Sequence, residues 1–97
     1  MSYYTQHIEK LAKGEQIQFR PVGNSMTPKI YSKQLVTIIP ATVDEVEKGD
    51  IVLCKVHGRI FVHLVTAKKD GQVQISNNHG HVNGWTTQVF GKVIKVE

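Results

Sequence analysis

A single cysteine, Cys54, occurs in the 97 residues, which excludes an internal disulfide and gives no reason to expect an oxidising compartment. Cys54 lies in the apolar run IVLCKV, which favours a buried structural thiol over a reactive one. No apolar stretch approaches the length needed to cross a bilayer. The first stretch, MSYYTQHIEKLAKG, is too polar for a secretory signal. We therefore expect a cytoplasmic protein with no membrane anchor.

Recognition motifs for phosphates, dinucleotides and metals are also missing from the sequence. GNSMTPK lacks the GK[ST] ending of a P-loop, and no dinucleotide fingerprint occurs. His79 and His81 are too few for a metal site, with no cysteine or carboxylate near them in sequence. A solvated face explains the acidic stretch ATVDEVEKGD better than paired carboxylates for glycoside chemistry. We expect neither a metal nor a cofactor.

The charge and the length fit a small basic domain. The formal net charge is +4 and apolar residues make up 40% of the chain, enough for one modest core over residues 1–97. Basic residues are scattered, and no basic run with interleaved aromatics is present. Nucleic-acid binding is therefore disfavoured, although a basic β-domain of that kind remains a third interpretation.

The apolar pattern changes from helical to strand spacing after the first residues. A short helix is predicted over residues 3–13, with Gly14 as its stop. Strand-like runs follow at EQIQFRP, LVTII, IVLCKV, RIFVHLV, QVQIS and VFGKVIKV, where Gly91 indicates a bulge. KKDG reads as a turn, and NNHGHVNGWT, residues 77–86, as a long polar loop. These runs predict a mostly-β domain with one N-terminal helix.

The dipeptide His57-Gly58 separates two strand-like runs and suits a two-residue hairpin loop. The register then pairs Val56 with Arg59, Cys54 with Phe61, and Val52 with His63. Because side chains alternate along a strand, His63 shares a face with apolar neighbours. An imidazole on such a face is either a satisfied core histidine or a functional base.

The stretch GNSMTPKI, residues 23–30, predicts a tight loop that presents one hydroxyl at a fixed angle. Gly23, Asn24 and Pro28 are turn formers. Ser25 is either a presented nucleophile or a serine that stabilises the turn. The backbone N–H groups around Ser25 and Met26 could stabilise a developing oxyanion, with Asn24 supporting the loop.

A serine hydroxyl becomes a good nucleophile only when a base accepts its proton. His63 would be held rigidly in the middle of a strand. His57 lies in a hairpin turn, where it would be mobile and hydrated, and His7 lies on the predicted helix as a surface residue.

Three stretches together resemble the LexA/UmuD-type and signal-peptidase superfamily. GNSMTPKI resembles its serine box, a glycine, one residue and then Ser-Met-x-Pro. EKGDIVLCKVHGRIFVHLV resembles the box that carries the general base, and ISNNHGHVNGWTTQVFGKVIKV resembles the C-terminal box. The boxes stand in the family's order and cover about residues 14–96. The resemblance implies a single small, coiled, antiparallel β-domain of the LexA C-terminal or signal-peptidase type.

The resemblance also implies roles for two residues. Ser25 would be the nucleophile, and the base position falls on His63. LexA-like and bacterial signal-peptidase members use a lysine there, whereas the endoplasmic-reticulum and archaeal type of signal peptidase uses a histidine. The chain therefore resembles a soluble Ser-His version of the serine peptidase domain that cuts an extended peptide.

The sequence departs from the family's pattern in the C-terminal box. That box usually carries Gly-Asp-Asn and a later aspartate, but here Ser76, Asn77, Asn78 and Asn83 occupy those positions. No carboxylate lies between Asp70 and Glu97. An asparagine, Asn77, Asn78 or Asn83, would have to orient the histidine through its amide, which fixes geometry without adding charge. Self-cleavage of the LexA kind is not expected, because no Ala-Gly or Cys-Gly bond is present.

Two interpretations from different classes follow. The first is a serine endopeptidase-like enzyme built on Ser25 and His63. The second is a binding module of the same fold that engages a LexA- or UmuD-like partner, or a second copy of itself, and cuts nothing. The missing aspartates favour the second interpretation.

Overall fold

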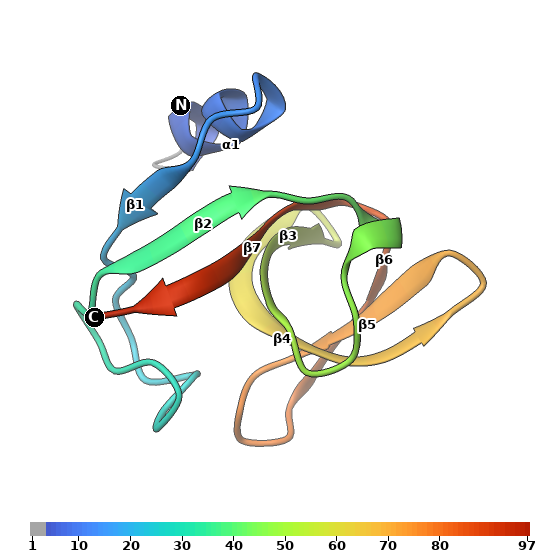
Figure 1. Ribbon diagram of the computed structural model, residues 1–97. Coiled ribbons are helices and arrows are strands. Elements are labelled where there is room, and N and C mark those ends of the chain that lie inside the picture. The colour runs from blue at the N-terminus through green and yellow to red at the C-terminus, as the bar shows by residue number, and fades with distance from the viewer. Residues whose placement is uncertain (1–3) are drawn as a thin grey trace.

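The computed structural model describes residues 4–97, which form one short helix and a seven-stranded antiparallel sheet (Figure 1). The strands lie in the order β1-β2-β7-β3-β4-β5-β6. The elements are α1 (Thr5–Ala12), β1 (Ile17–Phe19), β2 (Val36–Pro40), η1 (a 3-10 turn, Val43–Glu45), β3 (Ile51–Val56), β4 (Arg59–Lys69), β5 (Gln72–Ser76), β6 (Val82–Thr86) and β7 (Val89–Val96). The predicted mostly-β fold with one N-terminal helix is confirmed.

The helix α1 is slightly shorter than predicted. It begins at Thr5, and the predicted start at residue 3 lies outside the described residues. It ends at Ala12, where Gly14 adopts a φ of 86° and donates its N–H to the carbonyl of Leu11 at 3.0 Å. A positive φ favours glycine, so the predicted stop has a physical basis.

The sheet coils on itself, as the resemblance implied, so that β6, the last strand in the sheet order, returns to β3 (Figure 1). Thr86 donates its hydroxyl to the carbonyl of Lys55 at 2.6 Å, and the N–H of Lys55 donates to the carbonyl of Gln88 at 2.9 Å. A Cβ added to Gly84 would lie 2.9 Å from Nε2 of His57. Glycine at this position therefore lets β6 approach the β3–β4 turn closely.

The register of the β3–β4 hairpin is the one predicted from the His57-Gly58 loop. Val56 pairs with Arg59, Cys54 with Phe61, and Val52 with His63. His57 and Gly58 both have positive φ, 49° and 80°, as a type I′ turn requires. The turn thus decides which face of the sheet carries His63.

Alternation along β3 and β4 divides the apolar residues between two faces. Leu53 and Val62 pack on one face with α1, β1 and β2, in a cluster that includes Leu11, Phe19 and Ile38. On the other face Val52, Cys54 and Val65 form a second cluster with β5 and the start of β7. Cys54 is fully buried, as expected, and burial raises the pKa of its thiol to about 12.

Two predictions about the chain need correction. Residues 77–86 are not one long loop, because Val82–Thr86 form β6 beside β5. Asparagine and glycine are poor strand formers, so cross-strand pairing decides this segment rather than local propensity. His7 is not a simple surface residue. It is partly buried and stacks on Phe19, with ring centroids 4.8 Å apart.

Gly91 lies beside a bulge, as predicted, and also fills a tight space. Leu53 pairs with Gly91 but Cys54 pairs with Val89, which leaves Phe90 as the extra residue of β7. A Cβ on Gly91 would meet Ile38 at 2.6 Å and the carbonyl oxygen of Ile39 at 2.7 Å. Only glycine lets β2 approach β7 this closely.

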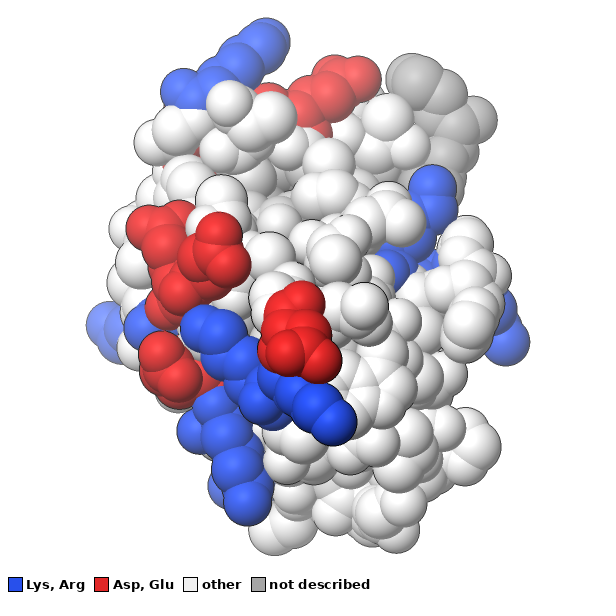
Figure 2. Space-filling model, turned by 90° about the vertical axis from the view of Figure 1, so that its right-hand side faces the viewer, with Lys and Arg blue, Asp and Glu red and all other residues white. Residues whose placement is uncertain are grey.

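Charged side chains of both signs lie next to one another on the face shown in Figure 2. Lys68 and Glu47 approach to 3.7 Å, and Lys92 and Asp50 to 3.9 Å. This face therefore carries no extended patch of one sign. No helix within residues 4–97 is long and apolar enough to span a bilayer.

Candidate active site

Ser25 lies in the loop between β1 and β2, and apolar residues anchor that loop to the core. Met26 and Ile30 are each 4% exposed and pack with the cluster that contains Leu53 and Phe19. The N–H of Ile30 donates to the carbonyl of Met26 at 3.0 Å. Ser25 itself is exposed. The buried side chain of Met26 therefore anchors the loop to the core, while the adjacent Ser25 presents its hydroxyl to solvent.

The turn after β5 holds the same loop from a second side. The N–H of Asn78 donates to the carbonyl of Ser25 at 2.8 Å, and its amide nitrogen donates to the carbonyl of Thr27 at 2.9 Å. Nε2 of His79 donates to the carbonyl of Asn24 at 2.9 Å. Three hydrogen bonds thus join segments about fifty residues apart. Their combined effect is to restrict where the Ser25 hydroxyl can move.

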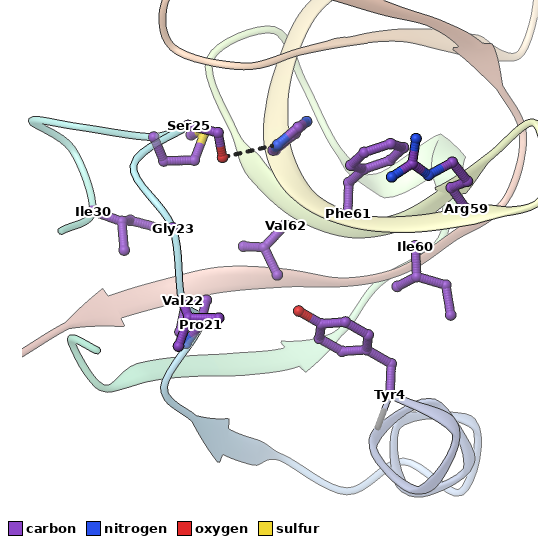
Figure 3. A pocket seen from close by; sticks show the side chains of 12 residues that line it. Tyr4, Pro21, Val22, Gly23, Ser25, Ile30, Arg59, Ile60, Phe61 and Val62 are labelled. Atoms are coloured by element: carbon purple, nitrogen blue, oxygen red, sulfur yellow. Dashed lines mark hydrogen bonds between the residues drawn. The ribbon is translucent and has the colours of Figure 1, made fainter. Parts of the chain in front are cut away.

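The side chain of His63 contacts the side chain of Ser25 at this loop. Nε2 of His63 lies 3.1 Å from Oγ of Ser25, the contact drawn in Figure 3. Nδ1 lies 2.7 Å from Oδ1 of Asn83. With the amide oxygen facing it, Nδ1 carries the proton and donates to Asn83. Nε2 is then free to accept the hydroxyl proton of Ser25.

Asn83 reaches His63 because it occupies a bulge in β6. Ile75 pairs with Gly84 and Ser76 pairs with Val82, so Asn83 is the unpaired extra residue between them. A bulge turns a side chain out of the regular alternation of a strand. Of the three predicted orienting asparagines, Asn83 alone touches the ring in residues 4–97.

The other two asparagines act on the backbone. Oδ1 of Asn77 accepts the N–H groups of His79 and His81 at 2.8 and 3.0 Å, which shapes the turn after β5. Asn78 binds the serine loop as described above. Asn24 contributes its carbonyl oxygen, which also accepts the Thr27 hydroxyl at 3.0 Å. Asn77 and Asn78, the other two candidates for orienting the ring, hydrogen-bond to backbone groups instead.

The surroundings of His63 keep the imidazole neutral at neutral pH. Its side chain lies with Phe61, whose ring centroid is 4.7 Å away, and the residue is 7% exposed. Burial, the largest cause, lowers the pKa of His63 below 6.5, and electrostatic interaction with His81 adds to this lowering. The hydrogen bond to Asn83 opposes both effects. A neutral imidazole with a free Nε2 is competent to act as a base.

Backbone donors lie next to the hydroxyl. Within residues 4–97, the N–H groups of Ser25 and Met26 have no hydrogen-bond acceptor. The backbone that carries them is held in place, because the Met26 side chain is buried in the core and the side-chain amide of Asn78 donates to the carbonyl of Thr27. Donors fixed in this way can stabilise negative charge on an oxygen without reorganising.

A cleft of about 370 Å³ runs from Ser25 and His63 along the start of β4 (Figure 3). Its walls are the segment after β1 and the first residues of β4, and its lining is apolar and polar in equal measure. The lining residues are Tyr4, Pro21, Val22, Gly23, Ser25, Met26, Ile30, Arg59, Ile60, Phe61, Val62 and His63. Tyr4, Arg59 and the segment after β1 were not identified from the sequence, because no local pattern marks them. Only the folded arrangement brings them to one cleft.

The first half of β4 presents an open edge to this cleft. β3 pairs with Arg59–Leu64 on one side, but β5 begins to pair only at Leu64. A two-residue hairpin makes Val56 and Arg59 a hydrogen-bonded pair, so Phe61 and His63 also bond to β3. The N–H and C=O groups of Ile60 and Val62 therefore point toward the cleft, where an added strand could pair with them.

No group of three or more His, Cys, Asp or Glu side chains in the described part of the chain is placed to hold a metal ion. His79, one half of the HGH motif, instead binds the serine loop. The side chains of Ser25 and His63 place a hydroxyl beside an imidazole.

Comparison with known proteins identifies the family of the chain. No curated protein matches the chain. A model of the family described as Peptidase S24-like matches residues 3–94, nearly the whole sequence. This match confirms the resemblance to the LexA/UmuD-type serine peptidase superfamily. The chain belongs to the Peptidase S24-like family.

Proposed function

We propose that this protein is a serine endopeptidase in which Ser25 is the nucleophile, His63 the general base and Asn83 the residue that orients His63. The single observation that carries the proposal is the chain of contacts from Oγ of Ser25 through both ring nitrogens of His63 to Oδ1 of Asn83, at 3.1 and 2.7 Å. Nucleophile, base and orienting group stand in the relation that serine catalysis requires.

The proposed chemistry follows from that geometry. Oγ of Ser25 forms a bond to the carbonyl carbon of the substrate while Nε2 of His63 takes its proton. The N–H groups of Ser25 and Met26 stabilise the oxyanion. The carbon–nitrogen bond then breaks, and His63 returns the proton to the leaving amine. Water attacks the resulting ester with the same base, which releases the acid and restores Ser25.

The proposed substrate is an extended peptide that pairs with the open edge of β4. Ile60 and Val62 offer their backbone N–H and C=O groups to such a strand. The peptide would pass between β4 and the segment after β1, which brings its backbone to Ser25. Cytoplasmic action is the part of this proposal that rests on composition alone.

The experiment is digestion of a complex peptide mixture, with new termini identified by mass spectrometry. Wild-type protein is expected to generate termini that Ser25→Ala does not generate. Ser32→Ala is the matched control, because Ser32 lies in the same loop and, within residues 4–97, its hydroxyl accepts only the N–H of Gly23, at 3.1 Å. Equal cleavage by wild type and Ser25→Ala would refute the proposal.

A second candidate function, a partner-binding module, is favoured by one observation. Asn83 occupies the position of an orienting acid but adds no negative charge to stabilise an imidazolium. Under this alternative a strand of a LexA- or UmuD-like partner, or of a second copy, lies in the cleft and stays uncut. Ser25→Ala would then leave binding unchanged, and no new termini would form.

A further inference from the structure

Three side chains form a stacked row on the face of β4 that carries His63. The rings of Phe61 and His63 stack with centroids 4.7 Å apart. The guanidinium of Arg59 lies over the other end of Phe61, 5.7 Å from the ring centroid, and Figure 3 shows it beside that ring. Arg59, Phe61 and His63 share this face because they alternate along the strand. A cation therefore stands at a fixed place along the cleft.

The charge of Arg59 is not neutralised within the structure. The ion pairs within residues 4–97 involve Lys68, Lys92 and Lys95, and none involves Arg59. No aspartate or glutamate lines the cleft. Arg59 is exposed, so its stacking on Phe61 leaves the N–H groups available to another partner. A cleft lined by one unpaired guanidinium and no carboxylate favours a negatively charged group at one position of the bound peptide.

The spacing along β4 fixes where that position falls. Arg59 and His63 are four residues apart in an extended strand, which corresponds to about 13 Å. A peptide that pairs with the edge of β4 has nearly the same rise per residue. The peptide side chain facing Arg59 is therefore about four residues from the one facing His63.

We propose that Arg59 is a specificity-determining residue, which selects extended peptides carrying an aspartate or glutamate about four residues from the bond held at Ser25. This inference rests on the proposed function for the identity of the bond. The carboxylate would accept hydrogen bonds from the planar guanidinium while the apolar part of the lining contacts its neighbours.

The test uses affinity selection from a randomised decapeptide library displayed on phage. Protein carrying Ser25→Ala is the bait, because it keeps the cleft but cannot consume the peptides. A second bait adds Arg59→Glu, and a control bait adds Lys69→Glu, the same charge reversal at the exposed end of β4 outside the cleft.

The Ser25→Ala bait is expected to enrich an acidic residue at one position, and Arg59→Glu to enrich a basic residue there. For a selected acidic peptide, Arg59→Glu should weaken affinity by about threefold to tenfold, and Lys69→Glu should leave it unchanged. Failure to enrich any peptide, enrichment without an acidic preference, or equal effects of the two reversals would overturn the inference.

Exposure of the selected peptides to protein with Ser25 intact separates this inference from the proposed function. Peptides that bind through Arg59 but stay uncut would refute the endopeptidase and leave the charge selection standing. Peptides that are cut at Ser25 without regard to their acidic residue would refute the charge selection and leave the endopeptidase standing.

Discussion

Oδ1 of Asn83 lies 2.7 Å from Nδ1 of His63, and Oγ of Ser25 lies 3.1 Å from Nε2 of the same ring. The imidazole is thus held between a hydroxyl and an amide that come from a loop and from a bulge in β6. The amide fixes the proton on Nδ1, so the ring faces Ser25 in its basic form. It contributes no charge, and this difference from an aspartate makes several results predictable.

Replacement of Asn83 separates orientation from charge. Asn83→Asp keeps the acceptor and adds a negative charge that stabilises the imidazolium, so kcat is expected to rise by about tenfold or more. Asn83→Ala removes the acceptor and should lower kcat by a similar factor or more. Rates of peptide cleavage, or of acylation by an active-site probe, measure both. A fall in rate for Asn83→Asp at neutral pH would contradict this view of the site.

The lowered pKa of His63 predicts how rate depends on pH. Because burial, with a smaller contribution from His81, lowers the pKa of His63 below 6.5, more than half of the rings are neutral at pH 6.5, and the rate there should exceed half of its plateau value. The rate should fall only when the pH drops through the lowered pKa. A pH profile of kcat/KM checks this, and a half-maximal rate above pH 6.5 would contradict it.

The same shift predicts a trend in stability. Between the lowered pKa and 6.5 the unfolded chain binds more protons at His63 than the folded protein does. The contribution of His63 to the free energy of unfolding is therefore complete above pH 6.5 and is lost as the pH falls below it. Denaturant melts of wild type and His63→Gln across this range test the trend, which should be weaker in the variant.

The contacts from Asn78 predict a loss of rate without loss of any reacting group. Asn78→Ala removes the hydrogen bond to the carbonyl of Thr27 and loosens the serine loop. We expect kcat to fall by about tenfold to a hundredfold and the free energy of unfolding to fall by about 1 kcal/mol. Gln72→Ala, at the exposed start of β5, is the control. Equal rates for the two variants would show that the contact does not position Ser25.

The packing of β2 and β7 predicts a contrast between two aspartate substitutions. Val36 in β2 is fully buried, so Val36→Asp places a charge in the core and should unfold the protein. Ile94 in β7 is 51% exposed, and Ile94→Asp should change the free energy of unfolding by less than about 1 kcal/mol. Circular dichroism during thermal unfolding measures both. Similar stability of the two variants would contradict the core assignment.

The sequence could predict the β3–β4 hairpin because its register depends on a local turn. His57-Gly58 fixes the pairing, and alternation then places His63 beside Phe61 on one face. The loop at Ser25 was predictable for the same reason, since Gly23 and the turn formers near it act locally. Both halves of the proposed Ser-His pair lie on such locally determined segments.

The remaining features depend on contacts between distant segments. Asn83 faces His63 only because β6 pairs with β5 through a bulge, and Asn83 and Gly84 at the middle of β6 are poor strand formers. The cleft likewise depends on where β5 begins to pair along β4, which leaves Ile60 and Val62 with an open edge. No pattern within either segment indicates these pairings.

The most direct test of the account is labelling of the purified protein with a fluorophosphonate probe, alongside Ser25→Ala, His63→Ala and the loop control Ser32→Ala. The account predicts labelling of wild type and of Ser32→Ala, none of Ser25→Ala, and a strong reduction in His63→Ala, with all four proteins folded by circular dichroism. Wild type that is folded but unlabelled, or labelling that survives Ser25→Ala, would contradict an activated Ser25–His63 pair.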